Sequence, residues 1–464
     1  MSLIHSTFNE DELQILSSTR EKREQYGEIF TPYMLIDRMF GMLTDEDFEN
    51  PNAKWLDPGA GTGFFSIYLF WKLDAGLAEI IPEKSLRRRH IITNMIYMVE
   101  LQEENVTTLA SLFGCGANIG HADFLTSDVF DAIGFDYVIG NPPYNKNGIK
   151  KVPTNNNKNK KNDGTTLWFA FIQKSVALLK SMGNLLMIVP SLWMKPDKMG
   201  AYDYITNHKL RRIECLSNTK TNRIFGGMAQ TPTCFFLLSK QPSDGVCDIY
   251  DTDMCDYISY TIRDKYPIPV FGVGIVNKFL CSVDTFGPLS VVKTNMPAKR
   301  VNLSVSKSEK YKYENIKTAR LEGLSPILDV NYSDAPLAFH GDAKLVLPHK
   351  MYGFPFIDLD GKYGISNRDN YVFVERNEED LRIICEFLST KTALYIYEAT
   401  RYRMKYLEKY AFLLLPDVTK IPELLALRPI TDATIAKYFR LCEDDMSCIE
   451  RLHTKNYDFK YKSY

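Results

Sequence analysis

The feature that most constrains the fold is an alternation of strand-like and helix-like segments from residue 54 to about residue 240. Seven short apolar stretches have the composition of strands: 54–57, 95–100, 118–123, 135–140, 184–189, 211–216 and 232–238. Stretches with apolar residues at helical spacing separate them, such as 65–73 and 167–180. This order predicts an α/β fold with a doubly wound, mostly parallel sheet. Ligands bind such a sheet at the carboxyl ends of its strands.

The chain is too long, at 464 residues, for one ordinary hydrophobic core. After residue 240 the apolar segments become shorter, and Pro, Ser, Asp and Gly cluster at 241–245. We therefore expect a first domain over residues 1–240, including a helical segment ahead of the sheet. A second, mixed α+β domain is expected over residues 246–464.

Composition excludes several classes of protein. No apolar run reaches the roughly 20 residues that cross a bilayer, and the amino terminus lacks a signal-peptide pattern. The nine cysteines form no Cys-x-x-Cys pair and the seven histidines are scattered, so we expect no metal site. These features predict a soluble, intracellular protein without a membrane partner. The net charge of -1 means that a polyanion would have to bind local basic patches.

A glycine-rich turn follows the first predicted strand. Asp57 ends that strand, and Gly59, Gly61 and Gly63 precede a helical stretch. Glycines at this turn let the backbone approach a bound cofactor, and the amino end of the helix suits an anionic group. We expect these four residues to bind a cofactor. The alternative is an ordinary tight turn.

Two further acids end the next strands. Glu100 has the position of an acid that accepts hydrogen bonds from both ribose hydroxyls of an adenosine-containing cofactor. It lies about 40 residues beyond the glycines rather than the usual 20 or so, because residues 74–90 are inserted. Glu100 could instead simply open the next helix. Asp123 and Phe124 could bind an adenine amine and ring, or be a surface acid and a core aromatic.

The stretch 137–148, YVIGNPPYNKNG, ends the fourth strand in Asn141, Pro142, Pro143 and Tyr144. Two consecutive prolines remove two backbone donors, so neither a helix nor a central strand can continue there. A four-residue match alone is equally compatible with a surface turn.

With these motifs in this order, the chain resembles the S-adenosylmethionine-dependent methyltransferases. It is most similar to the amino-group (N6-adenine) DNA methyltransferases of the gamma order that occur in restriction-modification systems. The resemblance covers residues 25–240 and implies S-adenosylmethionine as the cofactor. It also implies that Thr31 and Pro32 close over the methionine part of the cofactor, and that Phe225 packs on the target base. The implied location is the cytoplasm of a prokaryotic or virus-infected cell.

This resemblance suggests a chemical role for the Asn-Pro-Pro-Tyr motif. The adenine amine is a poor nucleophile, and acceptors at the Asn141 side chain and the Pro142 carbonyl can take both of its hydrogens. Tyr144 can stack on a base flipped out of the duplex, with Pro143 beside it. Cytosine C5 chemistry would need a cysteine after a proline, and none of the nine follows one.

The motif identifies the nucleophile but not the polymer. An RNA or glutamine amine methyltransferase is one alternative, and a catalytically silent DNA-binding protein of the same fold is another. Double-stranded DNA is favoured by the Thr-Pro loop and by a second domain that resembles target-recognition regions. Residues 145–166 contain six lysines, among them Lys150, Lys151 and Lys158, which are expected to contact phosphates. Residues 293–320, with eight Lys or Arg and two Glu, form a second such patch. The alternative for both segments is a solvated charged surface. A separate restriction endonuclease is the partner that this family implies.

Overall fold

In a computed structural model of the chain, two compact units are formed by Met1–Tyr250 and Asp251–Tyr464. The structure describes residues 31–451, except for 115, 147–165, 228, 230, 323–324, 348–354, 369 and 404–406. The helical segment that we expect near residues 9–24 lies outside this range.

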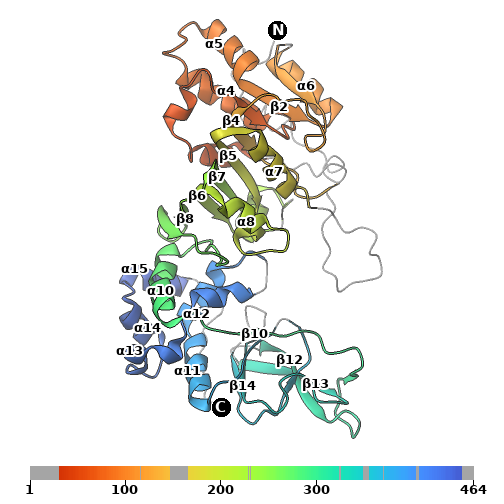
Figure 1. The fold of residues 1–464 in the computed structure, drawn as a ribbon, viewed down its shortest axis with the longest axis vertical. Helices are drawn as coiled ribbons and strands as arrows, with labels where there is room; N and C mark the ends of the chain where they lie inside the picture. The colour runs from red at the N-terminus through yellow and green to blue at the C-terminus, as the bar shows by residue number, and fades with distance from the viewer. Residues whose placement is uncertain are drawn as a thin grey trace. The chain divides into compact units, whose positions relative to one another are not determined.

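The first unit contains one large sheet, in which the strand order is β3-β2-β1-β4-β5-β7-β6-β8 (Figure 1). The neighbouring strands from β3 to β5 are parallel, and β7 is antiparallel to both β5 and β6. The strands are β1 (Trp55–Asp57), β2 (Ile96–Glu100), β3 (Asn118–His121), β4 (Phe135–Gly140), β5 (Leu179–Pro190), β6 (His208–Leu216), β7 (Thr233–Pro242) and β8 (Val246–Asp251). The predicted doubly wound, mostly parallel sheet is confirmed.

Helices cover this sheet. They are α3 (Tyr33–Phe40), α4 (Phe64–Gly76), α5 (Lys84–His90), α6 (Glu103–Phe113), α7 (Trp168–Leu178), α8 (Ala201–Thr206) and α9 (Asn218–Ile224). Shorter helical turns are Asp45–Phe48, the π-helical Ile91–Met95 and Ser191–Met194. Every residue of β1 and β2 is buried, so helices must shield both faces of the sheet there.

Aromatic stacking fixes the start of the central strand. The Trp55 ring stacks on Tyr137 of β4 at a centroid distance of 3.8 Å, and it also stacks with Phe48 at 5.6 Å. The Tyr137 hydroxyl donates to the Asp47 carboxylate at 2.5 Å. These contacts hold β1 beside β4. The chain adds β2 and β3 on one side of this pair, and it adds β5 and the later strands on the other side. The loops that follow β1 and β4 therefore meet at this switch point.

The second unit combines small sheets with helices. One sheet has the order β10-β17-β14-β15 and another β11-β13-β12-β16. The strands are β9 (Asp256–Thr261), β10 (Val292–Lys293), β11 (Leu303–Ser304), β12 (Tyr313–Glu322), β13 (Ser325–Ser333), β14 (Lys344–Leu347), β15 (Phe356–Asp358), β16 (Gly364–Ile365) and β17 (Tyr371–Phe373). The helices are α10 (Val273–Phe286), α11 (Glu378–Leu388), α12 (Lys391–Ala399), α13 (Pro422–Leu425), α14 (Asp432–Phe439) and α15 (Glu443–Arg451). The predicted mixed α+β character is confirmed.

Two features stabilise the sheets of this unit. Ile316, Val346, Ile365 and Val372 form a buried apolar cluster. The Lys344 ammonium and the Asp358 carboxylate form an ion pair at 2.5 Å, with both side chains almost fully buried. Because a buried charge is costly without its partner, this pair strongly favours the observed pairing of β14 with β15.

Candidate active site

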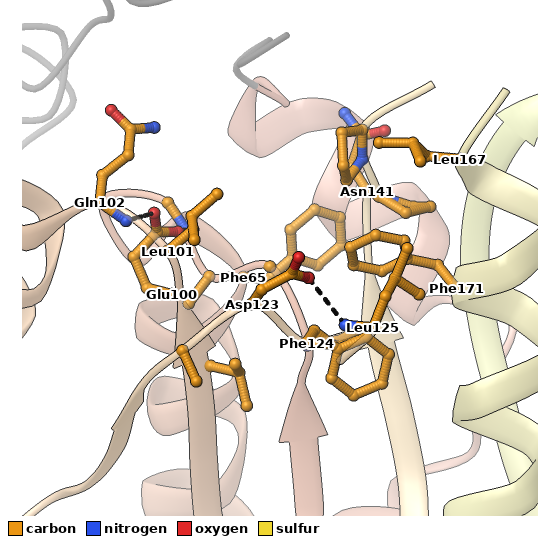
Figure 2. Close-up of a pocket in the computed structure, with 18 of the residues that line it drawn as sticks. Phe65, Glu100, Leu101, Gln102, Asp123, Phe124, Leu125, Asn141, Leu167 and Phe171 are labelled. Carbon is orange, nitrogen blue, oxygen red and sulfur yellow. Dashed lines mark hydrogen bonds between the residues drawn. The ribbon is translucent and has the colours of Figure 1, made fainter. Parts of the chain in front are cut away.

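One cavity lies at the carboxyl edge of the parallel strands. It encloses about 390 Å³ and is lined by residues of the loops that follow β1, β2, β3 and β4. Figure 2 shows Glu100 and Gln102 on one side of this cavity and Asn141 and Leu167 on the other, with Asp123 and Phe124 between them. Four segments that are distant in sequence thus contribute to a single site, as expected at a switch point.

The glycine turn forms the floor between β1 and α4. Gly59 and Gly61 line the cavity. Gly61 has a φ of 54°, a backbone conformation that residues with a Cβ atom rarely adopt. Gly63 has a different role, because a Cβ atom there would lie 2.8 Å from Leu109 Cδ2. A glycine at this position lets α4 begin in close contact with α6, below the cavity.

Asp57 lies beneath the glycine turn and is not among the described residues that line the cavity. Its carboxylate is buried and accepts a hydrogen bond of 3.0 Å from the Ser66 hydroxyl. Burial raises the pKa of the Asp57 carboxyl to about 7, although the hydrogen bond from Ser66 lowers it. Asp57 therefore joins the end of β1 to the first turn of α4 rather than facing the cavity.

Glu100 ends β2 and lines the cavity with its carboxylate held at both oxygens. One oxygen accepts from the Gly61 backbone amide at 2.8 Å, and the other from the Gln102 backbone amide at 2.7 Å. The side chain is only 6% exposed. Because each carboxylate oxygen has two lone-pair directions, Glu100 can still accept hydrogen bonds from a ligand.

Asp123 and Phe124 form the next part of the wall. The Asp123 carboxylate is exposed and accepts from the Leu125 backbone amide at 2.9 Å. The buried Phe124 ring packs on Phe171 at a centroid distance of 5.2 Å, and the Lys174 ammonium lies 5.3 Å from its centroid. An acceptor beside an apolar aromatic wall is suited to a flat heterocycle with an amino group.

The Asn-Pro-Pro-Tyr motif and Thr31 form the opposite side. Asn141, Pro142, Pro143 and Tyr144 all line the cavity directly after β4. The Asn141 side-chain amide donates to the Thr31 hydroxyl at 3.1 Å. The Tyr144 hydroxyl is buried and has no hydrogen-bond partner among the described residues, and burial raises the pKa of Tyr144 well above its usual range. Tyr144 thus lines the cavity without a hydrogen bond from its hydroxyl to any described residue.

Some predicted site residues lie elsewhere. Pro32 caps the start of α3 and Phe225 is 2% exposed at the end of α9, and neither is among the described residues that line the cavity. Lys150, Lys151 and Lys158 lie outside the described residues. Lys146, the first lysine of that segment, is exposed and lines the cavity.

Several lining residues were not expected from the sequence: Phe65, Leu101, Gln102, Leu125, Leu167 and Phe171. Two of them had a usable signal in the sequence: Leu101 directly follows Glu100, which ends β2, and Leu125 lies two residues after Asp123 in the loop that follows β3. Phe65 and Phe171 belong to helices, and which face of a helix meets the site depends on packing.

Two absences concern only the part of the chain that the structure describes. No group of three or more His, Cys, Asp or Glu side chains is arranged to hold a metal ion there. In the same ranges, no helix has the length and apolar character needed to span a bilayer.

A mostly parallel sheet whose glycine turn, second-strand acid and Asn-Pro-Pro-Tyr motif line one cavity at the switch point defines a Rossmann-like fold. Comparison with known proteins makes this class more specific. Residues 79–225 match the family described as Eco57I restriction-modification methylase.

Individual relatives agree with that match. An uncharacterized adenine-specific methylase of Mycoplasma pneumoniae is 40% identical over 77 residues, which are 16% of this chain and 18% of that protein. The modification methylase CviBIII of Paramecium bursaria Chlorella virus NC1A is 29% identical over 177 residues, 37% of this chain and 40% of that protein. The chain thus spans less than half the length of either relative. The expected resemblance to restriction-modification methyltransferases is confirmed.

Among solved structures, the type IIL restriction-modification enzyme MmeI, determined in complex with DNA, is similar over 96% of this chain and 78% of that one. The sequence identity is 12% and the TM-score is 0.48.

Proposed function

We propose that the chain is a site-specific DNA methyltransferase that transfers the methyl group of S-adenosylmethionine to the N6 amine of an adenine flipped out of duplex DNA. The observation that carries the proposal is the position of Asn141 on the cavity wall opposite Glu100, with Pro142, the next residue, also lining the cavity. One cavity thus offers acceptors for an amine at one side and an acceptor for ribose hydroxyls at the other. The names of the two curated relatives, an adenine-specific methylase and a modification methylase, favour adenine as the target.

The residues present fit S-adenosylmethionine. Gly61, with its positive φ, leaves space for close approach, and Glu100 is held by two backbone amides as an acceptor for the ribose. Phe124 and Asp123 would hold the adenine ring and its amine. Thr31 lies near the other end, where the family places the methionine part. The bound cofactor would supply an electrophilic methyl group on a sulfonium.

The chemistry of the chain itself lies in Asn141 and Pro142. The lone pair of the adenine amine is delocalised into the ring, so the amine must be held in a pyramidal arrangement to react. The Asn141 side-chain oxygen and the Pro142 carbonyl would accept its two hydrogens and stabilise the positive charge that develops on nitrogen. The fixed φ of Pro142 and Pro143 limits movement of these acceptors. No residue forms a covalent bond to the base.

Binding of a flipped base would rest on Tyr144. Tyr144 lines the cavity, and its backbone carbonyl accepts from the Leu167 amide at 3.0 Å, which fixes the chain around it. Stacking on this ring would replace part of the stacking energy that the base loses on leaving the duplex.

Recognition of DNA is assigned, within this proposal, to the second unit and to the lysines that follow Tyr144. In the second unit, Lys299, Arg300 and Lys312 are exposed and have the charge needed to contact phosphates. Lys307 and Lys362 are less available, because both form ion pairs with Glu314 at 2.9 and 3.0 Å. A restriction endonuclease on a separate chain is the partner that this function implies.

A panel of substrates with labelled S-adenosylmethionine tests the function. The panel contains duplex DNA of mixed sequence, the same DNA with adenine replaced by 2-aminopurine, structured RNA and a glutamine-containing peptide. We expect label in the adenine-containing DNA as N6-methyladenine. Label confined to RNA or to the peptide would assign the site to another planar amine. DNA binding without transfer to any substrate would indicate a catalytically silent binding protein.

A further inference from the structure

We propose that Thr31 is a positioning residue for Asn141: its hydroxyl accepts the Asn141 amide hydrogen and thereby favours the orientation in which the amide oxygen faces the target amine. The inference rests on the proposed function, because it concerns the acceptor of that reaction. It gives Thr31 a role in chemistry that is separate from closing over the cofactor.

The contact joins two distant segments. Asn141 Nδ2 lies 3.1 Å from Thr31 Oγ1, although 110 residues separate them in the chain. Thr31 is 3% exposed, Asn141 is half-buried, and both line the cavity. In this sheltered position a missing hydrogen bond cannot readily be replaced by bulk water.

Both partners are held on rigid elements. Pro32, next to Thr31, begins α3, and its carbonyl accepts from the backbone amides of Leu35 and Ile36 at 2.9 and 3.1 Å. The α3 helix then buries four apolar side chains, Leu35, Ile36, Met39 and Phe40. Asn141 directly follows β4, which pairs with strands on both sides. A contact between two such supports can fix a side chain to the accuracy that a reaction requires.

Orientation matters because the two ends of a carboxamide have opposite hydrogen-bonding character. Only the oxygen can accept a hydrogen from an amine, whereas the nitrogen end would place donor against donor. With the oxygen toward the substrate, the nitrogen must find an acceptor on the other side. Thr31 Oγ1 is that acceptor, and without it the productive orientation would leave a buried N–H group without this partner.

A double-mutant cycle separates this role from cofactor binding. Thr31→Val keeps the shape of the side chain but removes the acceptor, and Thr31→Ser keeps the hydroxyl. Each is combined with Asn141→Ala, which removes the amide. The single-turnover methylation rate on duplex DNA is measured beside two other quantities: S-adenosylmethionine affinity by calorimetry, and base flipping by 2-aminopurine fluorescence.

The matched control is Thr62→Val. Thr62 also lines the cavity and carries a buried hydroxyl, but that hydroxyl has no hydrogen-bond partner within the described chain. Any loss of single-turnover rate from Thr62→Val should therefore be the same in the wild-type background and in the Asn141→Ala background.

We expect Thr31→Val to slow the single-turnover rate about 10-fold when Asn141 is present and less than about 2-fold in the Asn141→Ala background. Thr31→Ser should recover most of the rate, and cofactor affinity and base flipping should stay near wild type. An equal loss in both backgrounds, or a loss that appears only in cofactor affinity, would overturn the proposal. If the wild type instead methylates RNA or a glutamine peptide, the cycle is run on that substrate, so failure of the DNA assignment remains distinguishable.

Discussion

The Glu100 carboxylate accepts a hydrogen bond of 2.8 Å from the Gly61 backbone amide, which ties the end of β2 to the glycine turn after β1. The same carboxylate accepts from the Gln102 amide at 2.7 Å. Glu100 therefore has two functions in our account: it shapes the turn that the cofactor would contact, and it is itself an acceptor for the cofactor.

Replacing Glu100 should affect both functions. Glu100→Ala leaves two backbone amides without their acceptor, so we expect S-adenosylmethionine affinity to fall by about 10-fold or more. Glu100→Gln retains an acceptor oxygen and should lose less. Glu103→Ala is the control, because Glu103 is exposed in the first turn of the next helix. Titration calorimetry that gives equal affinities for the Glu100→Ala and Glu103→Ala variants would contradict this role.

Gly61 should tolerate no branched side chain. Its φ of 54° is strained for valine, and Gly61 lines the cavity in which our account places the cofactor. We expect Gly61→Val to remove measurable cofactor binding. Gly200→Val measures the strain alone, because Gly200 has a φ of 78° and open space around it. Both variants should be destabilised in urea, but only Gly61→Val should lose calorimetric binding. Retained affinity in a folded Gly61→Val protein would exclude the close approach.

Tyr144 should act through its ring. Because its hydroxyl is buried without a hydrogen-bond partner in the described structure, Tyr144→Phe should keep both stability and most activity. Tyr144→Ala removes a stacking surface worth about 1 to 3 kcal/mol per base and should weaken the fluorescence rise of 2-aminopurine at the target position. A large loss of activity in the phenylalanine variant would show that the hydroxyl takes part.

Asp57 should make stability depend on pH. Its pKa is about 7 in the folded chain and about 4 in an unfolded one. Between these values the folded state binds the proton and the unfolded state does not, so the contribution of Asp57 to the free energy of unfolding falls as pH rises from about 4 to 7. Urea unfolding at pH 5 and pH 8 should reveal this as a difference between wild type and Asp57→Asn.

The hydrogen bond from Ser66 provides the control for this effect. It lowers the pKa of Asp57, so Ser66→Ala should raise that pKa further and extend the fall in stability to higher pH. The same pH slope in wild type and in Asp57→Asn would contradict the assignment of a raised pKa to this carboxyl.

The sheet was predictable because its signals are local. Each of the seven expected strands is present. They could be predicted because short apolar runs bounded by turn residues identify buried strands without knowledge of the fold. The strand β8 (Val246–Asp251) extends the sheet beyond residue 240, where we expected the first domain to end. The sequence of this strand, VCDIYD, does not show which sheet it joins.

The site was predictable only in part. The strand ends located Glu100, Asp123 and Asn141 near one edge, because parallel strands deliver their last residues there. The hydrogen bond between Thr31 and Asn141 could not be derived, because 110 residues separate them and only packing brings them together. Whether Asp57 lies under the turn or faces the cavity likewise depends on the approach of α4.

The central claim is that Asn141 accepts a hydrogen from the amine while it is methylated. The measurement is the single-turnover rate at which wild type and Asn141→Ala form N6-methyladenine in duplex DNA, beside cofactor and DNA affinities. We predict a rate lower by about 10²-fold or more for Asn141→Ala, with both affinities nearly unchanged, because the lost interaction matters most as charge develops on nitrogen. A wild-type rate in Asn141→Ala would contradict the account.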